Sequence, residues 1–312
     1  MELDSWFCDQ TWVRNGDVPC VTLGEEGAFD DMHIFGPAVA IVNDVYYLYY
    51  CGSRGEVEER VFRMGLATSD DGVKFKRHSE YPILDFGKKP SVLTPTFLRS
   101  GDGHALREDG RFRLWFSSTT FPPGLVHTVH ETTSTDGVAW DIPSNPQVGN
   151  AAYAPTVLKD ENRYLMWYTD VSSLPWSIRF AESGDGHTWD VRDDPVLEVD
   201  APWEHNRLVY PTVLKRDGAY LMWYGSYSEA ELQHTAIGFA ASVDGVHWVK
   251  HPQNPVFEPD PNREWESHYT TSQSLLVLSD GSIRMWYASR TKPPFTHKYL
   301  AIGTAVWRGA FR

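Results

Sequence analysis

Short runs of apolar residues alternate with polar turns along this chain, and the pattern repeats. Residues 155–168 read PTVLKDENRYLMWY, and residues 211–224 read PTVLKRDGAYLMWY. Looser copies occupy 37–50, 95–116 and 274–287, the second of them with an insertion. Each copy has an apolar run, a polar turn and an alternating aromatic run, which predicts a β-hairpin.

A second phrase, Ser-x-Asp-Gly-x-x-aromatic, follows the first four copies at 69–75, 134–140, 183–189 and 242–248. Asp-Gly is a strong turn signal because glycine accepts the positive φ of a tight turn. A proline comes a few residues later in each case. Each unit is therefore predicted to contain four short strands, and no helical periodicity is sustained anywhere.

Five units of four strands predict an all-β fold, a five-bladed β-propeller with four antiparallel strands per blade. The fifth unit lacks the Asp-Gly phrase. Residues 11–21 resemble residues 247–257, with Trp12 and Trp248 each seven residues before a proline. The N-terminal strand is therefore predicted to complete the C-terminal blade and close the ring, which removes free sheet edges.

Composition narrows the class of protein. The 312 residues carry a formal charge of −14, which disfavours nucleic acid and anionic membranes as partners. Three scattered cysteines form neither a disulfide framework nor a metal motif. Without a linker-like segment, residues 1–312 are interpreted as one domain. The first residues lack a leader pattern, and no long apolar stretch occurs, so a cytoplasmic location is expected.

Three acidic residues recur before the first strand of a unit. Asp30, Glu204 and Glu266 hold matching positions in units 1, 4 and 5, which are consecutive in a closed ring. Paired carboxylates over a groove are what glycosidic cleavage needs, since one protonates the leaving oxygen and another activates water or attacks the sugar. The alternative is that these acids cap turns or bond neighbouring blades.

Polar residues near these acids are the candidates for substrate binding. Arginine, histidine and tyrosine side chains bind sugar hydroxyls, carboxylates or phosphate, although the arginines also suit surface ion pairs. No metal site and no cofactor are predicted, because the chain has neither clustered metal ligands nor a nucleotide-binding motif. The predicted substrate-binding residues are Asp31, His33, Arg54, Asp170, His205, Arg207, Tyr227, His268 and Arg290.

The two repeated phrases resemble those of the five-bladed propeller glycosidases, which include the arabinanase and xylosidase, invertase and levanase, and mannoside phosphorylase groups. The resemblance implies an acid on the first blade as base or nucleophile, for which Asp30 or Asp31 is the candidate, and a glutamate on a later blade as acid. Two departures stand out. Gly36 occupies the place where arabinanase-like proteins have Asp. The Asn-Asp-Pro and Glu-Cys motifs of the invertase-like proteins do not occur.

These observations predict a glycoside hydrolase or transglycosylase that acts on a small glycoside or oligosaccharide. Asp30 would be the base or nucleophile and Glu204 the general acid, and Glu266 would tune pKa values or exchange roles with Glu204. Two alternatives remain open. One is a phosphorylase that uses the arginines and histidines to hold phosphate, and the other is a sugar-binding or biosynthetic propeller without hydrolytic activity.

Overall fold

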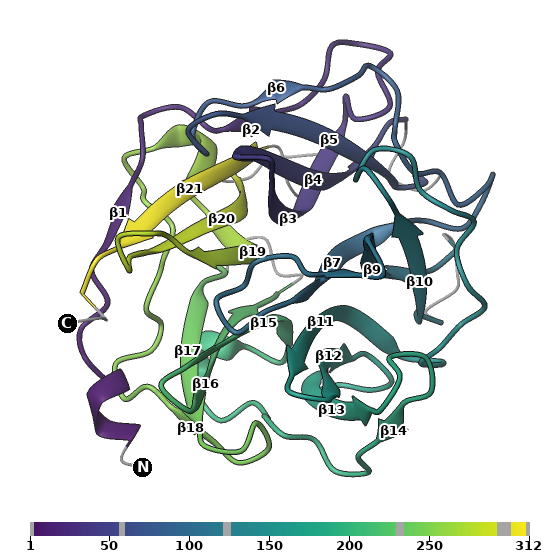
Figure 1. Ribbon diagram of the computed structural model, residues 1–312. Coiled ribbons are helices and arrows are strands. Elements are labelled where there is room, and N and C mark those ends of the chain that lie inside the picture. The colour runs from purple at the N-terminus through teal and green to yellow at the C-terminus, as the bar shows by residue number, and fades with distance from the viewer. Residues whose placement is uncertain (1–2, 56–59, 121–125, 229–233, 292–300, 310–312) are drawn as a thin grey trace.

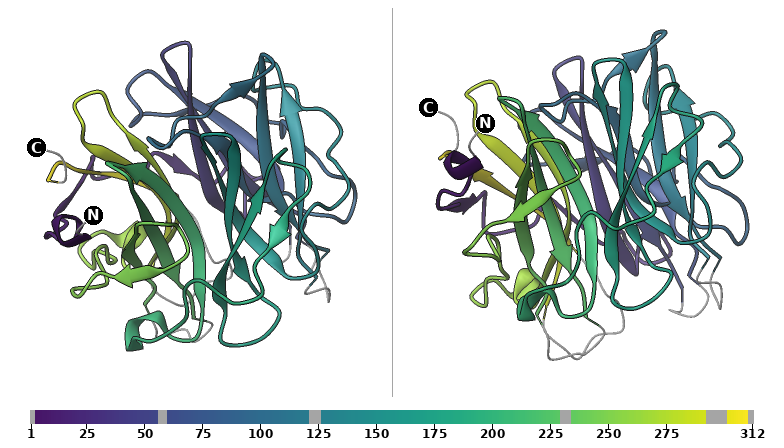
Figure 2. Two further views of the ribbon diagram at one scale, coloured as in Figure 1. Left: turned by 60° about the horizontal axis from the view of Figure 1, so that its bottom comes forward. Right: turned by 90° about the horizontal axis from the view of Figure 1, so that it is seen from below.

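The computed structural model describes all residues except 1–2, 56–59, 121–125, 229–233, 292–300 and 310–312, and the described chain is almost entirely β. Figure 1 shows the sheets arranged around a common centre, and Figure 2 shows them from the side. The helices of the described part are the short 3-10 segments η1 (Leu3–Trp6), η3 (Pro202–Glu204) and η4 (Glu264–Glu266). None of the described helices is long and apolar enough to span a membrane.

Each repeated unit forms an antiparallel set of strands, and the strands of a set follow one another along the chain. Unit 1 contains β3 (His33–Val42), β4 (Val45–Ser53), β5 (Arg63–Ser69) and β6 (Lys76–Arg77). Unit 2 contains β7 (Leu93–Arg99), β8 (Arg107–Glu108), β9 (Arg111–Ser118) and β10 (Thr128–Ser134). Unit 3 contains β11 (Ala152–Asp160), β12 (Arg163–Asp170), β13 (Ser177–Ser183) and β14 (Asp190–Val191).

Units 4 and 5 follow the same plan. Unit 4 contains β15 (Leu208–Arg216), β16 (Ala219–Ser226), β17 (Ile237–Ser242) and β18 (Trp248–Lys250). Unit 5 contains β19 (Tyr269–Val277), β20 (Ile283–Arg290) and β21 (Ala301–Trp307), together with β1 (Trp12–Arg14) and β2 (Val21–Thr22) from the start of the chain.

Unit 2 departs from the predicted four strands. The segment that corresponds to the outer strands of units 1, 3 and 4 forms no strand in unit 2, although the Asp141 N–H still donates to the Thr133 carbonyl at 2.9 Å. Pro143 and Pro146 lie in this segment, and proline cannot donate a ladder hydrogen bond. The first strand of unit 2, β7, also pairs in parallel with the first strand of unit 3, β11, through Leu98 and Arg99. Units 2 and 3 therefore form one eight-stranded sheet.

The start of the chain pairs with its end, as predicted. Trp12 lies opposite Trp307 in the antiparallel pair of β1 and β21. The Trp12 ring also packs against Trp223 and Phe257, with centroids 6.4 and 6.3 Å away. Aromatic burial therefore accompanies the backbone pairing that completes unit 5.

The Asp-Gly turns connect each unit to the one before it. In unit 1, Asp71 Oδ1 accepts the backbone N–H groups of Val73 and Lys74, each at 2.8 Å. These two bonds are the main reason that the pKa of Asp71 lies below its ordinary value. The turn leaves the Gly72 carbonyl free to accept a 2.9 Å hydrogen bond from Trp286 of unit 5.

A hydrogen bond from an aromatic side chain to the glycine carbonyl of an Asp-Gly turn in the next unit recurs around the molecule. The Tyr49 hydroxyl of unit 1 donates to the Gly137 carbonyl of unit 2 at 2.8 Å, and Trp167 of unit 3 donates to Gly245 of unit 4 at 2.8 Å. Unit 5 lacks the Ser-x-Asp-Gly-x-x-aromatic phrase after its hairpin, and Gln10 from the N-terminal segment instead accepts the hydrogen bond of Trp223 of unit 4 at 3.0 Å. The Asp-Gly turns thus supply hydrogen-bond acceptors that hold neighbouring units together.

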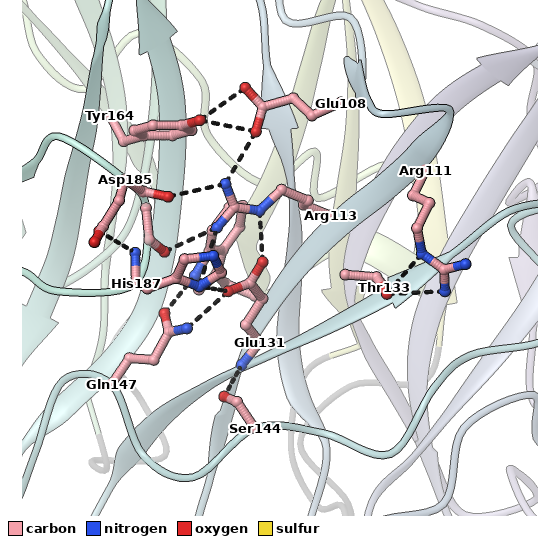
Figure 3. A network of polar contacts seen from close by, with 12 residues as sticks. Glu108, Arg111, Arg113, Glu131, Thr133, Ser144, Gln147, Tyr164, Asp185 and His187 are labelled. Carbon is pink, nitrogen blue, oxygen red and sulfur yellow. Dashed lines mark hydrogen bonds and ion pairs between the residues drawn. The ribbon is translucent and has the colours of Figure 1, made fainter.

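Units 2 and 3 share a buried polar network (Figure 3). The Arg113 guanidinium donates to Glu131 at 2.5 Å, to Glu108 at 2.9 Å and to the Gly186 carbonyl at 3.0 Å. Burial by itself would raise the pKa of Glu108, but hydrogen bonds from Lys159, Arg113 and Tyr164 outweigh it and lower the pKa to about 2. An ionised Glu108 therefore stabilises this junction.

The first strands of all five units surround one central cavity. Each of them has a register irregularity at the same place, typical of a β-bulge. The residue at each bulge has a positive φ between 48° and 62°, and only one of the five is glycine. These residues, which line the cavity, are Gly36, Thr94, Ala154, Tyr210 and Ser272.

The insertion in unit 2 closes one end of this cavity. The loop 100–106 lies across the ends of two first strands, because its Gly101 carbonyl accepts Lys215 N–H at 2.8 Å and its Asp102 carbonyl accepts Val277 N–H at 3.0 Å. The Arg216 side chain pairs with Asp102 at 2.7 Å. The opposite end, where the first strands begin, is called the mouth below.

Candidate functional site

Asp30 precedes β3 and is buried inside unit 1. Its Oδ2 accepts the Tyr50 hydroxyl at 2.7 Å and Arg77 Nε at 2.9 Å. The Phe29 ring stacks on Tyr50 with centroids 6.2 Å apart. Tyr50 belongs to the second strand of the unit and Arg77 to the fourth, so Asp30 lies over the sheet rather than beside its first strand.

Glu204 has equivalent partners in unit 4. Its Oε1 accepts the Tyr224 hydroxyl at 2.8 Å and Lys250 Nζ at 2.7 Å. Its Oε2 accepts the backbone N–H groups of Asp200 and Ala201 at 2.8 and 3.1 Å. The side chain is fully buried, and four donors surround it.

Glu266 repeats the arrangement in unit 5. The Tyr287 hydroxyl donates to Oε2 at 2.6 Å, and Arg14 Nε lies 2.9 Å from Oε1. Arg14 comes from β1, the strand that completes this sheet. Burial raises the pKa of Glu266 despite these favourable partners.

We call each set of carboxylate, second-strand tyrosine and outer-strand cation a clasp. A glycine on the third strand provides the room for it. A Cβ at Gly65, Gly238 or Gly303 would lie 2.5–2.9 Å from the clasp tyrosine and 2.4–2.7 Å from the aromatic ring of the residue before the acid. The carboxylates bond within their own units, and none of them lines the central cavity. The structure thus shows three similar clasps, and it does not bring the three acids into contact with one another.

Aromatic side chains from several units meet at the mouth. They form one continuous cluster with buried residues of all five units, so the mouth is the place where the repeats converge. The aromatic members are Phe35, Phe62, Tyr153, Trp176, Tyr210, Tyr227 and Tyr269.

Arg207 is held among these rings. Its guanidinium lies 4.7 Å from the centroid of Trp176 and 5.4 Å from that of Tyr227. The two rings are stacked, with an interplanar angle of 4°. Such contacts orient the guanidinium by cation–π attraction. The predicted binding residues Arg207 and Tyr227 are therefore brought together.

A second polar group surrounds Tyr269. The Arg290 guanidinium lies 3.4 Å from the Tyr269 ring centroid, and the His268 ring lies 4.7 Å from it. His268 also contacts His234, with ring centroids 4.6 Å apart, and His205 Nε2 lies 2.7 Å from the His234 carbonyl oxygen. The predicted residues His205, His268 and Arg290 thus belong to one side of the mouth.

Of the remaining predicted residues, His33 contacts the aromatic cluster at the mouth, whereas Asp31, Arg54 and Asp170 have their contacts elsewhere. His33 is buried between Phe35 and Phe62, with ring centroids 5.2 and 4.9 Å away. Asp31 Oδ2 accepts the Gly27 N–H at 2.7 Å, and exposed Arg54 donates weakly to the Gly27 carbonyl at 3.4 Å. These contacts hold Asp31 and Arg54 on the loop before β3.

Asp170 is engaged inside unit 3. Its Oδ2 accepts Arg179 Nε at 2.5 Å, and its Oδ1 accepts the Ser172 N–H at 2.9 Å. Burial opposes ionisation, but these hydrogen bonds lower the pKa of Asp170 below its usual range.

Two tyrosines at the mouth were missed by the sequence analysis. The Tyr153 and Tyr210 hydroxyl groups are 3.0 Å apart, and their rings meet at 5.6 Å. Burial raises the pKa of Tyr210 well above its ordinary value, and the Tyr153 neighbour adds to this effect. Their place just before the Pro-Thr of a first strand is the signal that would have found them.

Comparison with known proteins finds relatives by sequence as well as by structure. No protein-family model matches it. Uncharacterised proteins of two Mycobacterium tuberculosis strains (CDC 1551 / Oshkosh and H37Rv) are 27% identical over 221 residues, which cover 66% of this chain and 71% of theirs.

Solved structures share the architecture. One comes from work on the GH130 family of mannoside phosphorylases, which contains glycoside hydrolases that target β-1,2-mannosidic linkages in Candida mannan. It has a TM-score of 0.74 and 14% identity, and the match covers 97% of this chain and 95% of that one. A thermostable family-43 glycoside hydrolase matches with a TM-score of 0.68 and 17% identity over 89% and 91% of the chains. The chain thus shares the fold of propeller glycoside hydrolases, in agreement with the resemblance of its repeats.

Proposed function

We propose that this protein is a five-bladed β-propeller that binds and processes a small glycoside or oligosaccharide at the mouth of its central cavity. The observation that carries this proposal is the convergence of aromatic and cationic side chains from several units at that one end. Ligand sites gather where loops of repeated units meet over a rigid scaffold. Each of the five units is then one blade.

The chemistry of the mouth suits a sugar. Tyrosine and tryptophan rings pack against the apolar face of a sugar, and arginine and histidine donate to its hydroxyl groups. Arg207 and Arg290 are held by aromatic rings, so their guanidinium groups are oriented before a ligand arrives. The same groups also suit phosphate, which is the co-substrate of a phosphorylase.

The catalytic assignment remains a proposal. With Asp30 as base or nucleophile and Glu204 as general acid, each carboxylate would have to act while bonded to its tyrosine and cation. The buried hydrogen bonds of each carboxylate to a tyrosine and a cation favour the second candidate function, in which the protein binds sugar without hydrolysing it. The two functions predict different effects of the substitutions Asp30→Asn and Glu204→Gln on turnover.

A screen of nitrophenyl glycosides, with and without added phosphate, tests the proposed function. Turnover without phosphate supports a hydrolase, and strict dependence on phosphate supports a phosphorylase. Sugar binding by calorimetry without turnover supports the second candidate. An absence of both turnover and binding across the sugar panel contradicts the proposal.

Site-directed variants locate the activity. Replacing Arg207 by Met is expected to weaken sugar binding at least tenfold, because an oriented charged donor is lost. The matched control is Arg163→Met, because the Arg163 side chain is 57% exposed and pairs with Glu182 at the outer part of unit 3. Asp30→Asn and Glu204→Gln then decide the catalytic assignment: lost turnover in a protein that is still folded under the assay conditions supports it, whereas retained turnover rejects it.

A further inference from the structure

Arg99 is a buried cation on the wall of the central cavity, far from the clasps. It ends β7 and is 3% exposed. Its Nη2 donates to Ser274 Oγ at 2.9 Å and its Nη1 to the Leu275 carbonyl at 3.3 Å, both on β19. The side chain therefore reaches from unit 2 to unit 5 at the closed end of the cavity.

This charge lacks a carboxylate partner. None of the ion pairs among the described residues includes Arg99, and its Nε has no acceptor there. Burial lowers the pKa of Arg99 to about 10, so the group still carries its charge at neutral pH. A guanidinium offers five N–H donors. The two hydrogen bonds of Arg99 to neutral oxygens therefore leave some of its N–H donors unused and its positive charge uncompensated.

The cavity beside Arg99 is lined by polar groups. Thr96, Thr156 and Thr212 follow the prolines of three first strands and all contribute to its wall. Thr212 Oγ1 donates to the Gln273 carbonyl at 2.9 Å, and Thr156 lines the same cavity. No acidic side chain is among the described residues that line this cavity.

The size of the cavity limits its occupant. Its volume is about 30 Å³, which accommodates about two water molecules or one monatomic ion. A sugar ring does not fit, so this space is separate from the sugar site proposed at the mouth. A cation is disfavoured by the Arg99 charge, and a small anion is favoured by it.

From these four observations we infer that the central cavity is a binding site for a halide ion, with chloride as the natural occupant, held by the Arg99 guanidinium and the Thr156 hydroxyl. The anion neutralises the buried charge and links units 2, 3 and 5 at the closed end. The inference does not rest on the proposed sugar chemistry.

Crystals of the full chain grown with sodium bromide provide the direct test. An anomalous bromine peak in the cavity, next to Arg99 and Thr156, is the expected result. Density explained by water alone, with no anomalous signal at that position, overturns the proposal. The measurement uses the wild-type protein, so it does not depend on the folding of any variant.

Urea unfolding in chloride or bromide, compared with gluconate at equal ionic strength, tests binding in solution. Gluconate is too large for the cavity, so halide is expected to raise the unfolding midpoint selectively. Thr156→Val should raise the half-saturating bromide concentration about tenfold, the effect of one lost hydrogen bond to a charged group. Arg163→Met, which removes an exposed cation elsewhere, should leave the halide response unchanged.

Arg99→Met should remove the halide response altogether if the variant folds. An identical response in halide and gluconate, or an unchanged bromide affinity in Thr156→Val, contradicts the assignment. A bromine peak that persists in Arg99→Met would show that the guanidinium does not hold the ion and would equally overturn it.

Discussion

Replacing Glu204 by Gln tests whether a clasp is a structural element. Each oxygen of this carboxylate accepts two donors: Tyr224 and Lys250 on one side, and the N–H groups of Asp200 and Ala201 on the other. A glutamine has one oxygen and one NH₂ group. Whichever way the amide lies, two buried donors therefore lose their acceptor and face an N–H group.

The expected cost follows from those two bonds. A hydrogen bond to a charged group contributes about 1.5–3 kcal/mol, and breaking one side of a buried ion pair costs about 3–5 kcal/mol. Lys250 keeps Asp200 and the Glu198 carbonyl, each at 2.7 Å, which reduces the loss. We expect Glu204→Gln to lower the free energy of unfolding by about 3 kcal/mol.

Urea unfolding followed by tryptophan fluorescence measures this change. Asp200→Asn is the matched control, because Asp200 binds the same Lys250 nitrogen but is 68% exposed. An exposed pair contributes about 0–1 kcal/mol, so the control should stay close to wild type. A Glu204→Gln protein within about 1 kcal/mol of wild type, or equal costs for both variants, would refute the clasp as a source of stability.

Three further predictions follow from buried groups. Glu266→Gln should lower the free energy of unfolding less than Glu204→Gln does in the same urea assay, because burial raises the pKa of Glu266 and so disfavours its charged form. An equal or larger decrease for Glu266→Gln contradicts this ranking. Glu108 has a pKa of about 2, below its unfolded value, so its stabilisation is complete above about pH 4.3 and is lost as the pH falls toward 2. Acid titration of stability should show this loss in wild type and a smaller loss in Glu108→Gln, because the variant has no carboxylate to protonate. Gly303→Ala places a Cβ 2.4 Å from Trp265 and should destabilise by about 2 kcal/mol in thermal unfolding, whereas Gly149→Ala, with nothing within 4 Å, should be nearly neutral.

The strand pattern was predictable because it is local. The hairpin predicted over 155–168 is present as β11 and β12, and the Asp-Gly phrases form the turns that were expected. The pairing of Trp12 with the last sheet was also predictable, since the first strand carries the part of the repeat that unit 5 lacks. Period-two alternation and turn chemistry are short-range signals that a sequence displays directly.

The environment of the acids was not predictable in the same way. Asp30, Glu204 and Glu266 do occupy equivalent places, as their alignment indicated, but their partners are distant in sequence; Arg14 and Glu266 come from opposite ends of the chain. A feature present in three copies belongs more readily to the scaffold than to a reaction centre, which is used once. The third-strand glycine in each of the same units was a signal of that scaffold.

The pairing of β1 with β21 has a consequence for synthesis in the cell. Residues 12–14 are synthesised before their partners at 305–307. Until those partners and Glu266 have been made, Trp12 lacks its paired strand and Arg14 lacks its carboxylate. Unit 5 therefore cannot be completed until residues 305–307 have been made, and in that interval the nascent molecule is most open to misassociation with another.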